Sequence, residues 1–224
     1  MKILAVSDEE CAALWEYYTP GKLKEYDLIL SCGDLNSKYL SFLVTMARCP
    51  LLYVVGNHDI RYEISPPEGC DPIDDHFVVY NGVRILGLGG CRRYNSAPNQ
   101  YTDAQMRRRI RKLRFQLWRH KGVDIVVTHA APEGLGDAED PCHLGFESLR
   151  KLLDKYHPQY LVHGHVHVTY GQNVPREIEY NGTKVINAYE RYTFEIPERP
   201  VPVKQLGQVI YKTRYHQNYL DNNF

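Results

Sequence analysis

Short apolar runs recur along this chain, and most of them stop at a group of polar residues. The runs occupy residues 3–6, 28–30, 51–55, 83–88, 123–127 and 160–162. Runs of this length, with many β-branched residues, are typical of strands that are covered on both faces. The pattern therefore predicts a series of buried strands.

Between several of these runs, apolar residues repeat every three or four positions, which is the spacing of one helix face. This repeat predicts three helices. Their apolar faces contain Leu40, Leu43, Val44 and Ala47; Met106, Ile110, Leu113 and Leu117; and Phe146, Leu149, Leu152 and Leu153. Strands that alternate with helices indicate an α/β fold built in layers.

Two asparagine–glycine pairs mark tight turns. Asn81-Gly82 separates FVVY from VRILGL, and Asn181-Gly182 separates EIEY from TKVINA. Because this pair accepts the positive φ angles of a two-residue turn, each predicts a β-hairpin. We expect one domain over residues 1–224, in which βα units are combined with antiparallel strands. The tail after Pro197 either adds a last strand or crosses the surface.

The charge balance is neutral, with 27 Lys or Arg and 27 Asp or Glu among 224 residues. This balance favours neither a nucleic acid nor a membrane as the partner. No apolar stretch reaches the length of a membrane span. The six cysteines are scattered without a Cys-x-x-Cys pair, which in a chain of this length favours reduced thiols and a cytoplasmic protein.

Five of the apolar runs lead into residues that can bind a metal ion. In open α/β sheets, ligands bind at the edge formed by the carboxyl ends of the strands, so these residues should meet there. Carboxylates, an amide and imidazoles together suit a divalent transition metal. The residues are, in chain order, Asp8 and Glu10; Asp34; Asn57, His58 and Asp59; His129; and His163, His165 and His167.

Each of these groups alone is also typical of a helix cap, a turn or a loop. The set in this order, however, resembles the calcineurin-like metallophosphoesterases, whose motifs are D-x-H, GD, GNH[DE], a lone His and GHxH. The resemblance implies two β-sheets packed face to face, with helices outside and two metal ions at the sheet edge. Manganese is the expected metal, with iron, zinc or nickel as alternatives. By this resemblance, Asp8 and His167 bind the first metal; Asn57, His129 and His165 bind the second; Asp34 bridges both; and His58 lies near the leaving group.

The first motif departs from the family pattern, because Glu10 stands where the family has His. Glutamate and histidine both place a donor atom four bonds from Cα, and a carboxylate is an acceptable ligand for these metals. We therefore expect Glu10 to bind the first metal. The alternative is that Glu10 begins a helix, where an acid is favourable, and that the first metal is weak or absent.

A third carboxylate would make the site about neutral once a hydroxide bridges the metals. A neutral site attracts a phosphate dianion less, so we expect a preference for monoanionic diesters or a need for nearby arginines. Arg92 and Arg93 could clamp the phosphate, although they could equally be solvated loop cations. His143, in His143-Leu144-Gly145, could line the substrate pocket, or could belong to an ordinary loop.

The resemblance also implies the reaction. A hydroxide held by the two metals attacks phosphorus in line, and His58 protonates the departing alkoxide. Asp59 could orient His58. The second motif lacks the GDxxDRG pattern of protein phosphatases, so a small phosphoester is the expected substrate.

The alternatives are a binding scaffold of this fold, a phosphomonoesterase and a nuclease. Because a scaffold need not keep His58, its presence favours an enzyme. The basic stretch at residues 105–120 holds seven Lys or Arg. It is either a solvated helix face or a patch for an anionic partner.

Overall fold

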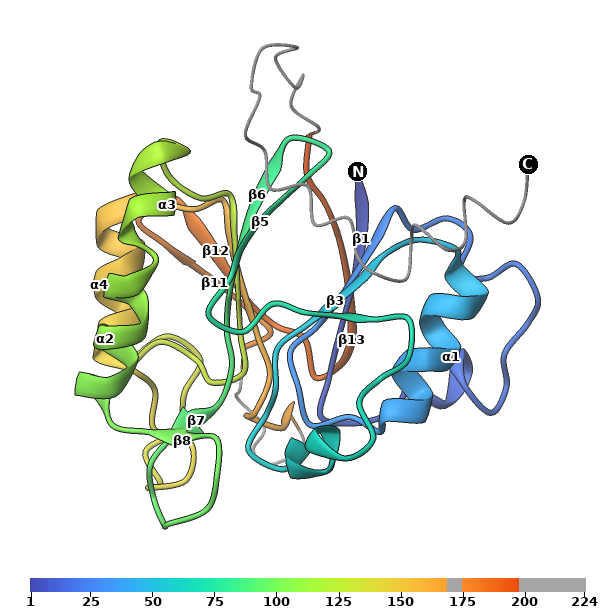
Figure 1. Cartoon of the computed structure of the whole chain (residues 1–224), viewed down its shortest axis with the longest axis horizontal. Helices are drawn as coiled ribbons and strands as arrows, with labels where there is room; N and C mark the ends of the chain where they lie inside the picture. Colours follow the sequence, from blue (N-terminus) through green and yellow to red (C-terminus); the bar gives the residue numbers. More distant parts are fainter. Residues whose placement is uncertain (169–174, 198–224) are drawn as a thin grey trace.

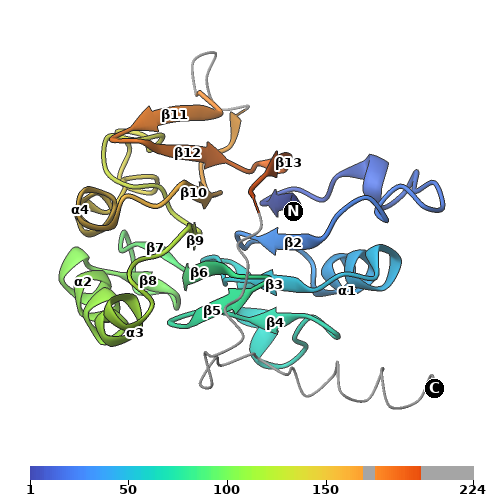
Figure 2. The same ribbon diagram turned by 90° about the horizontal axis from the view of Figure 1, so that it is seen from above.

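Two β-sheets lie face to face at the centre of the molecule, and helices cover both outer sides (Figure 1). The computed structural model describes residues 1–168 and 175–197. Seen from above, helix α1 (Ser37–Ala47) lies outside one sheet (Figure 2). Helices α2 (Asp103–Lys112), α3 (Arg114–Arg119) and α4 (Glu147–Tyr156) lie outside the other. This arrangement confirms the expected fold of two mixed sheets flanked by helices.

The two large sheets have five and six strands. The first has the order β13 (Glu190–Glu195), β1 (Lys2–Ser7), β2 (Leu28–Ser31), β3 (Leu51–Tyr53) and β4 (Asp71–Pro72). The second has the order β11 (Glu177–Tyr180), β12 (Thr183–Asn187), β10 (Tyr160–His163), β9 (Ile125–Thr128), β6 (Val83–Leu88) and β5 (Phe77–Tyr80). The short strands β7 (Cys91–Arg92) and β8 (Gln100–Tyr101) pair with each other. Two 3-10 helices, η1 (Ala12–Leu14) and η2 (Asp59–Glu63), follow β1 and β3.

The apolar runs are continuous because both faces of the inner strands are covered. Along β1, Ile3 and Ala5 pack in the layer between the sheets. Leu4 and Val6, which point the other way, pack in the layer that includes Leu40 and other residues of α1. No position on such a strand remains for a solvated side chain, so the alternating pattern of a half-exposed strand does not occur.

The strands that carry the candidate ligands run parallel, as the βα pattern predicts. Strand β1 pairs parallel to β2, β2 to β3, and β9 to β10. Their carboxyl ends therefore lie at the same edge of each sheet, and the two sheets contribute neighbouring edges. Both Asn-Gly hairpins are confirmed, as β5–β6 and β11–β12. The predicted tail after Pro197 lies outside the described residues.

One predicted helix is divided in two. The repeat from Met106 to Leu117 predicts a single helix, but Leu113 ends α2 and precedes α3. The backbone N–H of Leu113 bonds to the carbonyl of Ile110, a tightened i→i−3 turn, before the α3 bonding begins. Because no Pro or Gly marks this position, the sequence gives no signal for the break.

The basic stretch is not uniformly solvated. Arg109 is buried, and its guanidinium donates to Asp75 (2.6 Å), to the Gly89 carbonyl (2.6 Å) and to Asp74 (3.3 Å). The Asp74 carboxylate in turn accepts the backbone N–H of Val55. Helix α2 is thus linked to the strand that precedes the Gly56-Asn57-His58-Asp59 loop. Among the described helices, none combines the length and apolar character that crossing a bilayer requires.

Candidate metal centre

Three site residues, each just after the end of a strand, have a left-handed backbone conformation. Asp8, Asp34 and His165 have φ angles of 66°, 57° and 68°. This conformation is uncommon outside glycine but is tolerated by Asp and His, and it turns each side chain sharply back toward the edge. The motif residues therefore meet at one place although they come from different strands.

The motif glycines make this close packing possible. A Cβ added at Gly56 would lie 2.0 Å from Oδ1 of Asp34, and one added at Gly33 would lie 2.4 Å from the backbone nitrogen of Gly56. At Gly164, a Cβ would lie 1.8 Å from Oγ of Ser7 and 2.4 Å from Asp8. The glycines in GD, GNHD and GHVH are thus required because other loops of the site pack directly against them.

Two buried histidines are each held in one tautomer by a backbone carbonyl. Nδ1 of His129 lies 2.8 Å from the carbonyl oxygen of Cys32, and Nε2 of His165 lies 2.7 Å from that of Cys142. A carbonyl can only accept, so these nitrogens carry the protons. The lone pairs remain on Nε2 of His129 and Nδ1 of His165, which is how metal-binding histidines are oriented.

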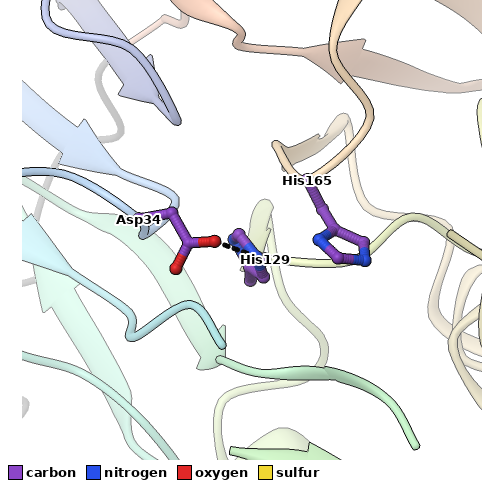
Figure 3. A group of neighbouring side chains, drawn as sticks. All are labelled: Asp34, His129 and His165. Atoms are coloured by element: carbon purple, nitrogen blue, oxygen red, sulfur yellow. Dashed lines mark ion pairs between the residues drawn. The ribbon is translucent and has the colours of Figure 1, made fainter. Parts of the chain in front are cut away.

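Nε2 of His129 faces two oxygen acceptors. It lies 3.3 Å from Oδ2 of Asp34, the pair joined by the dashed line in Figure 3. It also lies 3.0 Å from Oδ1 of Asn57. Ligand atoms of Asp34, His129 and His165 all lie within 4.8 Å of one another. Lone pairs that converge in this way require a positive charge among them, either a proton on His129 or a metal cation.

The pKa shifts of His129 and Asp34 indicate the same need for a positive charge. Burial alone would lower the pKa of His129, but the charges of Asp34 and Asp8 raise it to about 9. Burial alone would raise the pKa of Asp34, but attraction to His129 lowers it to about 2. A carboxylate, an amide oxygen and two imidazole nitrogens are suitable ligands for a divalent transition metal. These residues therefore fit a metal ion.

The residues expected at the first metal lie beside this cluster. The side chain of Asp8 is 1% exposed, and both its oxygens accept the backbone N–H of His165, at 3.0 and 2.9 Å. Nε2 of His167 lies 4.0 Å from Oδ1 of Asp8, and its ring packs against Tyr189. The structure thus brings Asp8 and His167 together at the edge of the site.

Glu10 makes a contact that the sequence does not predict. It is exposed, and its Oε1 accepts the backbone N–H of Asn36 at 3.0 Å. Asn36 is the N-cap of α1, and its own side chain accepts the N–H of Lys38. Glu10 therefore contributes to the start of α1, whereas the sequence alternative placed it at the start of its own helix. A metal-binding role for Glu10 stays a prediction.

His58 and Asp59 lie next to the cluster but differ in environment. His58 is exposed, and its backbone N–H donates to Oδ1 of Asp34 at 2.8 Å. Asp59 is 5% exposed, and its Oδ2 accepts the N–H groups of Asp34 (2.8 Å) and Gly56 (2.7 Å). Burial raises the pKa of Asp59 to about 6. Among the described residues, the hydrogen bonds of Asp59 fix the Asp34 and Gly56 backbones, and none joins it to His58.

Comparison with known proteins identifies the family. Residues 1–169 match the model of the calcineurin-like phosphoesterases. The chain belongs to the calcineurin-like phosphoesterase family. Since this family hydrolyses phosphoric esters with divalent metals, the protein is a metal-dependent phosphoester hydrolase. The search among curated proteins found no match.

Solved structures show the same fold. One solved chain aligns with a TM-score of 0.62 and 15% identity, over 86% of this chain and 93% of its own length. The protein TT1561 of Thermus thermophilus aligns with a TM-score of 0.57 and 18% identity, over 84% of this chain and 89% of that one. A candidate 5'-nucleotidase from Staphylococcus aureus, solved with alpha-ketoglutarate, aligns with a TM-score of 0.52 and 15% identity, over 88% of this chain and 51% of that one.

Three further residues that the sequence assigns to substrate binding lie around this phosphoesterase centre. Nη1 of Arg92 donates to the Gly145 carbonyl at 3.0 Å, and Arg93 contacts Gln100 and Gln105. Nδ1 of His143 lies 2.9 Å from Asp140, and its ring is 5.0 Å from that of His165. His143 is thus close to the metal centre, while both arginines contact protein groups. Phosphate binding by these residues stays a prediction.

Sequence reasoning missed the groups that orient the phosphoesterase histidines. The carbonyls of Cys32 and Cys142 act through the backbone, so no residue type could reveal them. It also missed Tyr94, whose hydroxyl accepts a hydrogen bond from Nδ2 of Asn57 at 3.4 Å. Tyr94 follows β7 in the same stretch as Arg92 and Arg93, and only the fold places it beside Asn57. His163, which precedes the GHVH motif and is not among the ligands that the family resemblance implies, is buried, and its Nδ1 lies 2.9 Å from the Gly164 carbonyl oxygen.

Proposed function

We propose that the protein is a two-metal phosphodiesterase that acts on small molecules. The observation that supports this most strongly is the convergence of Asp34 and Asn57 on the lone pair of His129. In this proposal Asn57, His129 and His165 hold one ion, Asp8, Glu10 and His167 hold the other, and Asp34 is shared. Two divalent ions there supply polarisation of the phosphoryl oxygens and an acidified water.

In this proposal His58 is the proton donor. It is exposed at the start of η2, and its backbone is fixed to Asp34 by the hydrogen bond to Oδ1. A phosphoester held by metal ions at Asp34 would then have its leaving group on the side of His58, whose side chain is open to solvent. Donation of a proton to the departing alkoxide is worth a factor of about 10² to 10⁴ in rate.

The charge around the centre favours a diester over a monoester. Asp8, Glu10 and Asp34 supply three carboxylates. Arg92 and Arg93, which could add positive charge, contact protein groups instead. A monoanionic phosphodiester needs less positive charge than a dianionic monoester. We further propose manganese as the metal, with iron, zinc or nickel as alternatives. A cytoplasmic location suits the six free cysteines.

The test is hydrolysis of bis-p-nitrophenyl phosphate by metal-stripped protein with and without Mn²⁺. We expect manganese-dependent turnover that exceeds the turnover of p-nitrophenyl phosphate. His58→Ala should lower kcat by about 100-fold or more and leave the bound metal, measured by atomic emission, unchanged. His157→Asn provides the control, because His157 is an exposed helix C-cap with φ of 44° that Asn also adopts.

Two results would redirect the proposal. Faster hydrolysis of monoesters, including a nucleoside 5'-monophosphate, would favour the activity named for the Staphylococcus aureus structure. No turnover with Mn²⁺, Fe²⁺, Zn²⁺ or Ni²⁺, with metal still bound, would favour a binding scaffold.

A further inference from the structure

A pair of exposed aromatic residues lies on helix α3. Phe115 is 60% exposed and Trp118 is 74% exposed, and their ring centroids are 5.9 Å apart. Large apolar side chains that lie together on a surface mark an interaction site more often than single ones do. The apolar face of the helix is separate from this pair, because Leu113 and Leu117 pack in the core.

Two hollows adjoin these aromatic residues. Their volumes are about 640 and 530 Å³, and both are lined by Trp118, Lys155 and Tyr156. Lys155 and Tyr156 are the last residues of α4, so the hollows lie where α3 and α4 end side by side. We call this surface, formed by Arg114, Phe115, Trp118, Arg119, Lys121, Lys155 and Tyr156, the α3 patch.

The α3 patch is strongly cationic. Arg114, Arg119, Lys121 and Lys155 are all exposed, and no acidic residue lines either hollow. In the described part of the chain, none of these four cations forms a salt bridge. Helix α2 extends the charge with four more exposed residues, which are Arg107, Arg108, Arg111 and Lys112. The neutral total charge of the chain therefore conceals a surface suited to an anionic partner.

The α3 patch lies at the opposite end of the molecule from the metal centre. After α3, the chain passes Lys121 and enters the start of β9, whereas His129 follows the end of β9. Similarly, α4 leads into the start of β10, and His165 follows its end. Figure 1 shows α3 at the upper end of the strands, with β7 and β8 at the lower end.

We propose that the α3 patch docks the enzyme on the anionic face of a phospholipid membrane. Lysines and arginines near such a surface attract lipid phosphates, and Trp and Phe enter the headgroup layer. Phe115 and Trp118 stand side by side among the cations of the α3 patch, so both rings can enter that layer at once. A surface that binds a nucleic-acid strand would instead carry aromatic rings spaced along a row of cations. The cations of the α3 patch also do not lead to the metal centre.

Docking in this way leaves the metal centre facing the solution. The enzyme would then act on soluble phosphoesters while held at the membrane. The inference rests on surface residues alone and does not depend on the proposed diesterase activity.

The test is co-sedimentation of the full chain with vesicles. We expect binding to vesicles of phosphatidylglycerol and phosphatidylcholine in equal amounts, weakened by salt, and no binding to phosphatidylcholine alone. The double variant Phe115→Ala/Trp118→Ala should partition about tenfold more weakly, because it removes both rings that enter the headgroup layer. Arg114→Gln/Arg119→Gln should reduce partition similarly. The control Tyr17→Ala/Ile64→Ala removes two other exposed side chains, 74% and 90% exposed, and should bind as wild type.

Phosphoesterase activity and thermal melting of all the variants should match wild type, which separates docking from folding and catalysis. Equal binding of wild type and the aromatic variant, or no binding to anionic vesicles, would overturn the proposal. So would tight binding of a fluorescent single-stranded oligonucleotide without vesicle binding, or a dimer in light scattering that the aromatic variant dissociates.

Discussion

At the scale of single residues, the candidate metal centre depends on groups outside its expected ligand set. The two buried histidines are oriented by the carbonyls of Cys32 and Cys142. The backbone of Asp34 is fixed by Asp59, which also holds Gly56. Such supporting contacts typically change metal affinity by about 10- to 100-fold when they are removed.

Asp59→Ala tests the support of the Asp34 loop. The change leaves two buried N–H groups without an acceptor, so we expect a loss of about 3 kcal/mol in the free energy of unfolding. Manganese affinity, measured by titration calorimetry, should fall about tenfold or more. Asp59→Asn keeps an oxygen that can accept both bonds and should lose far less of each. Equal losses for Ala and Asn would show that the charge of Asp59 matters rather than its hydrogen bonds.

Because His163 is buried, we expect the folded state to become less stable in acid. Burial lowers its pKa to about 4, so between that value and its ordinary value of 6.5 the unfolded chain binds a proton that the folded chain does not. Stability should therefore fall as pH decreases through this range, by at most about 1.4 kcal/mol per pH unit from this residue. Urea unfolding of wild type and His163→Gln at pH 6.5 and 5.0 measures the difference in slope. Parallel slopes would exclude His163 as a cause.

At the scale of helices and strands, the sequence predicts most of the fold because the strands are covered on both faces. The runs ending before Asp8, Asp34 and His129 are confirmed as strands, and parallel pairing brings their ends together. The break at Leu113 was not predictable, because it follows from a local change of hydrogen bonding. Nor was the contact of Glu10 with Asn36, since these residues meet only after β1 and β2 have paired.

Among the arginines of helix α2, we expect Arg109 to contribute most to stability. Arg109→Ala removes the guanidinium that pairs with the half-buried Asp74 and donates an N–H to the Gly89 carbonyl. We expect a loss of about 3 kcal/mol in urea unfolding. Arg107→Ala and Arg111→Ala, exposed on the same helix, should change stability by less than about 0.5 kcal/mol. Similar losses of stability at all three positions would mean that they arise from helix propensity and not from the ion pair of Arg109.

At the scale of the whole molecule, the metal centre spans both sheets. Asp8, Asp34 and Asn57 follow strands of the five-stranded sheet, while His129 and His165 follow strands of the six-stranded sheet. An ion bound there would join the two halves of the fold, so metal binding and global unfolding would be coupled.

Metal removal should lower the melting temperature. At a free Mn²⁺ concentration 100 times the dissociation constant, one site adds about 2.7 kcal/mol of stability. Calorimetric scans of the protein with Mn²⁺ and after dialysis against a chelator measure the shift. His129→Ala should lose the shift, because it removes a ligand from the cluster. A shift that survives in this variant would place the stabilising ion elsewhere.

The apolar layer between the sheets, which no substrate touches, also sets the distance between the two sheets. Ala5 and Ala188 are fully buried there, among larger side chains such as Ile125 and Val162. Interiors are close-packed, so a larger residue at either alanine would push the sheets apart. The thickness of this apolar layer thus determines how far the carboxylates that follow strands of one sheet lie from the imidazoles that follow strands of the other. Interior changes far from the edge could retune which metal fits, while every ligand stays in place.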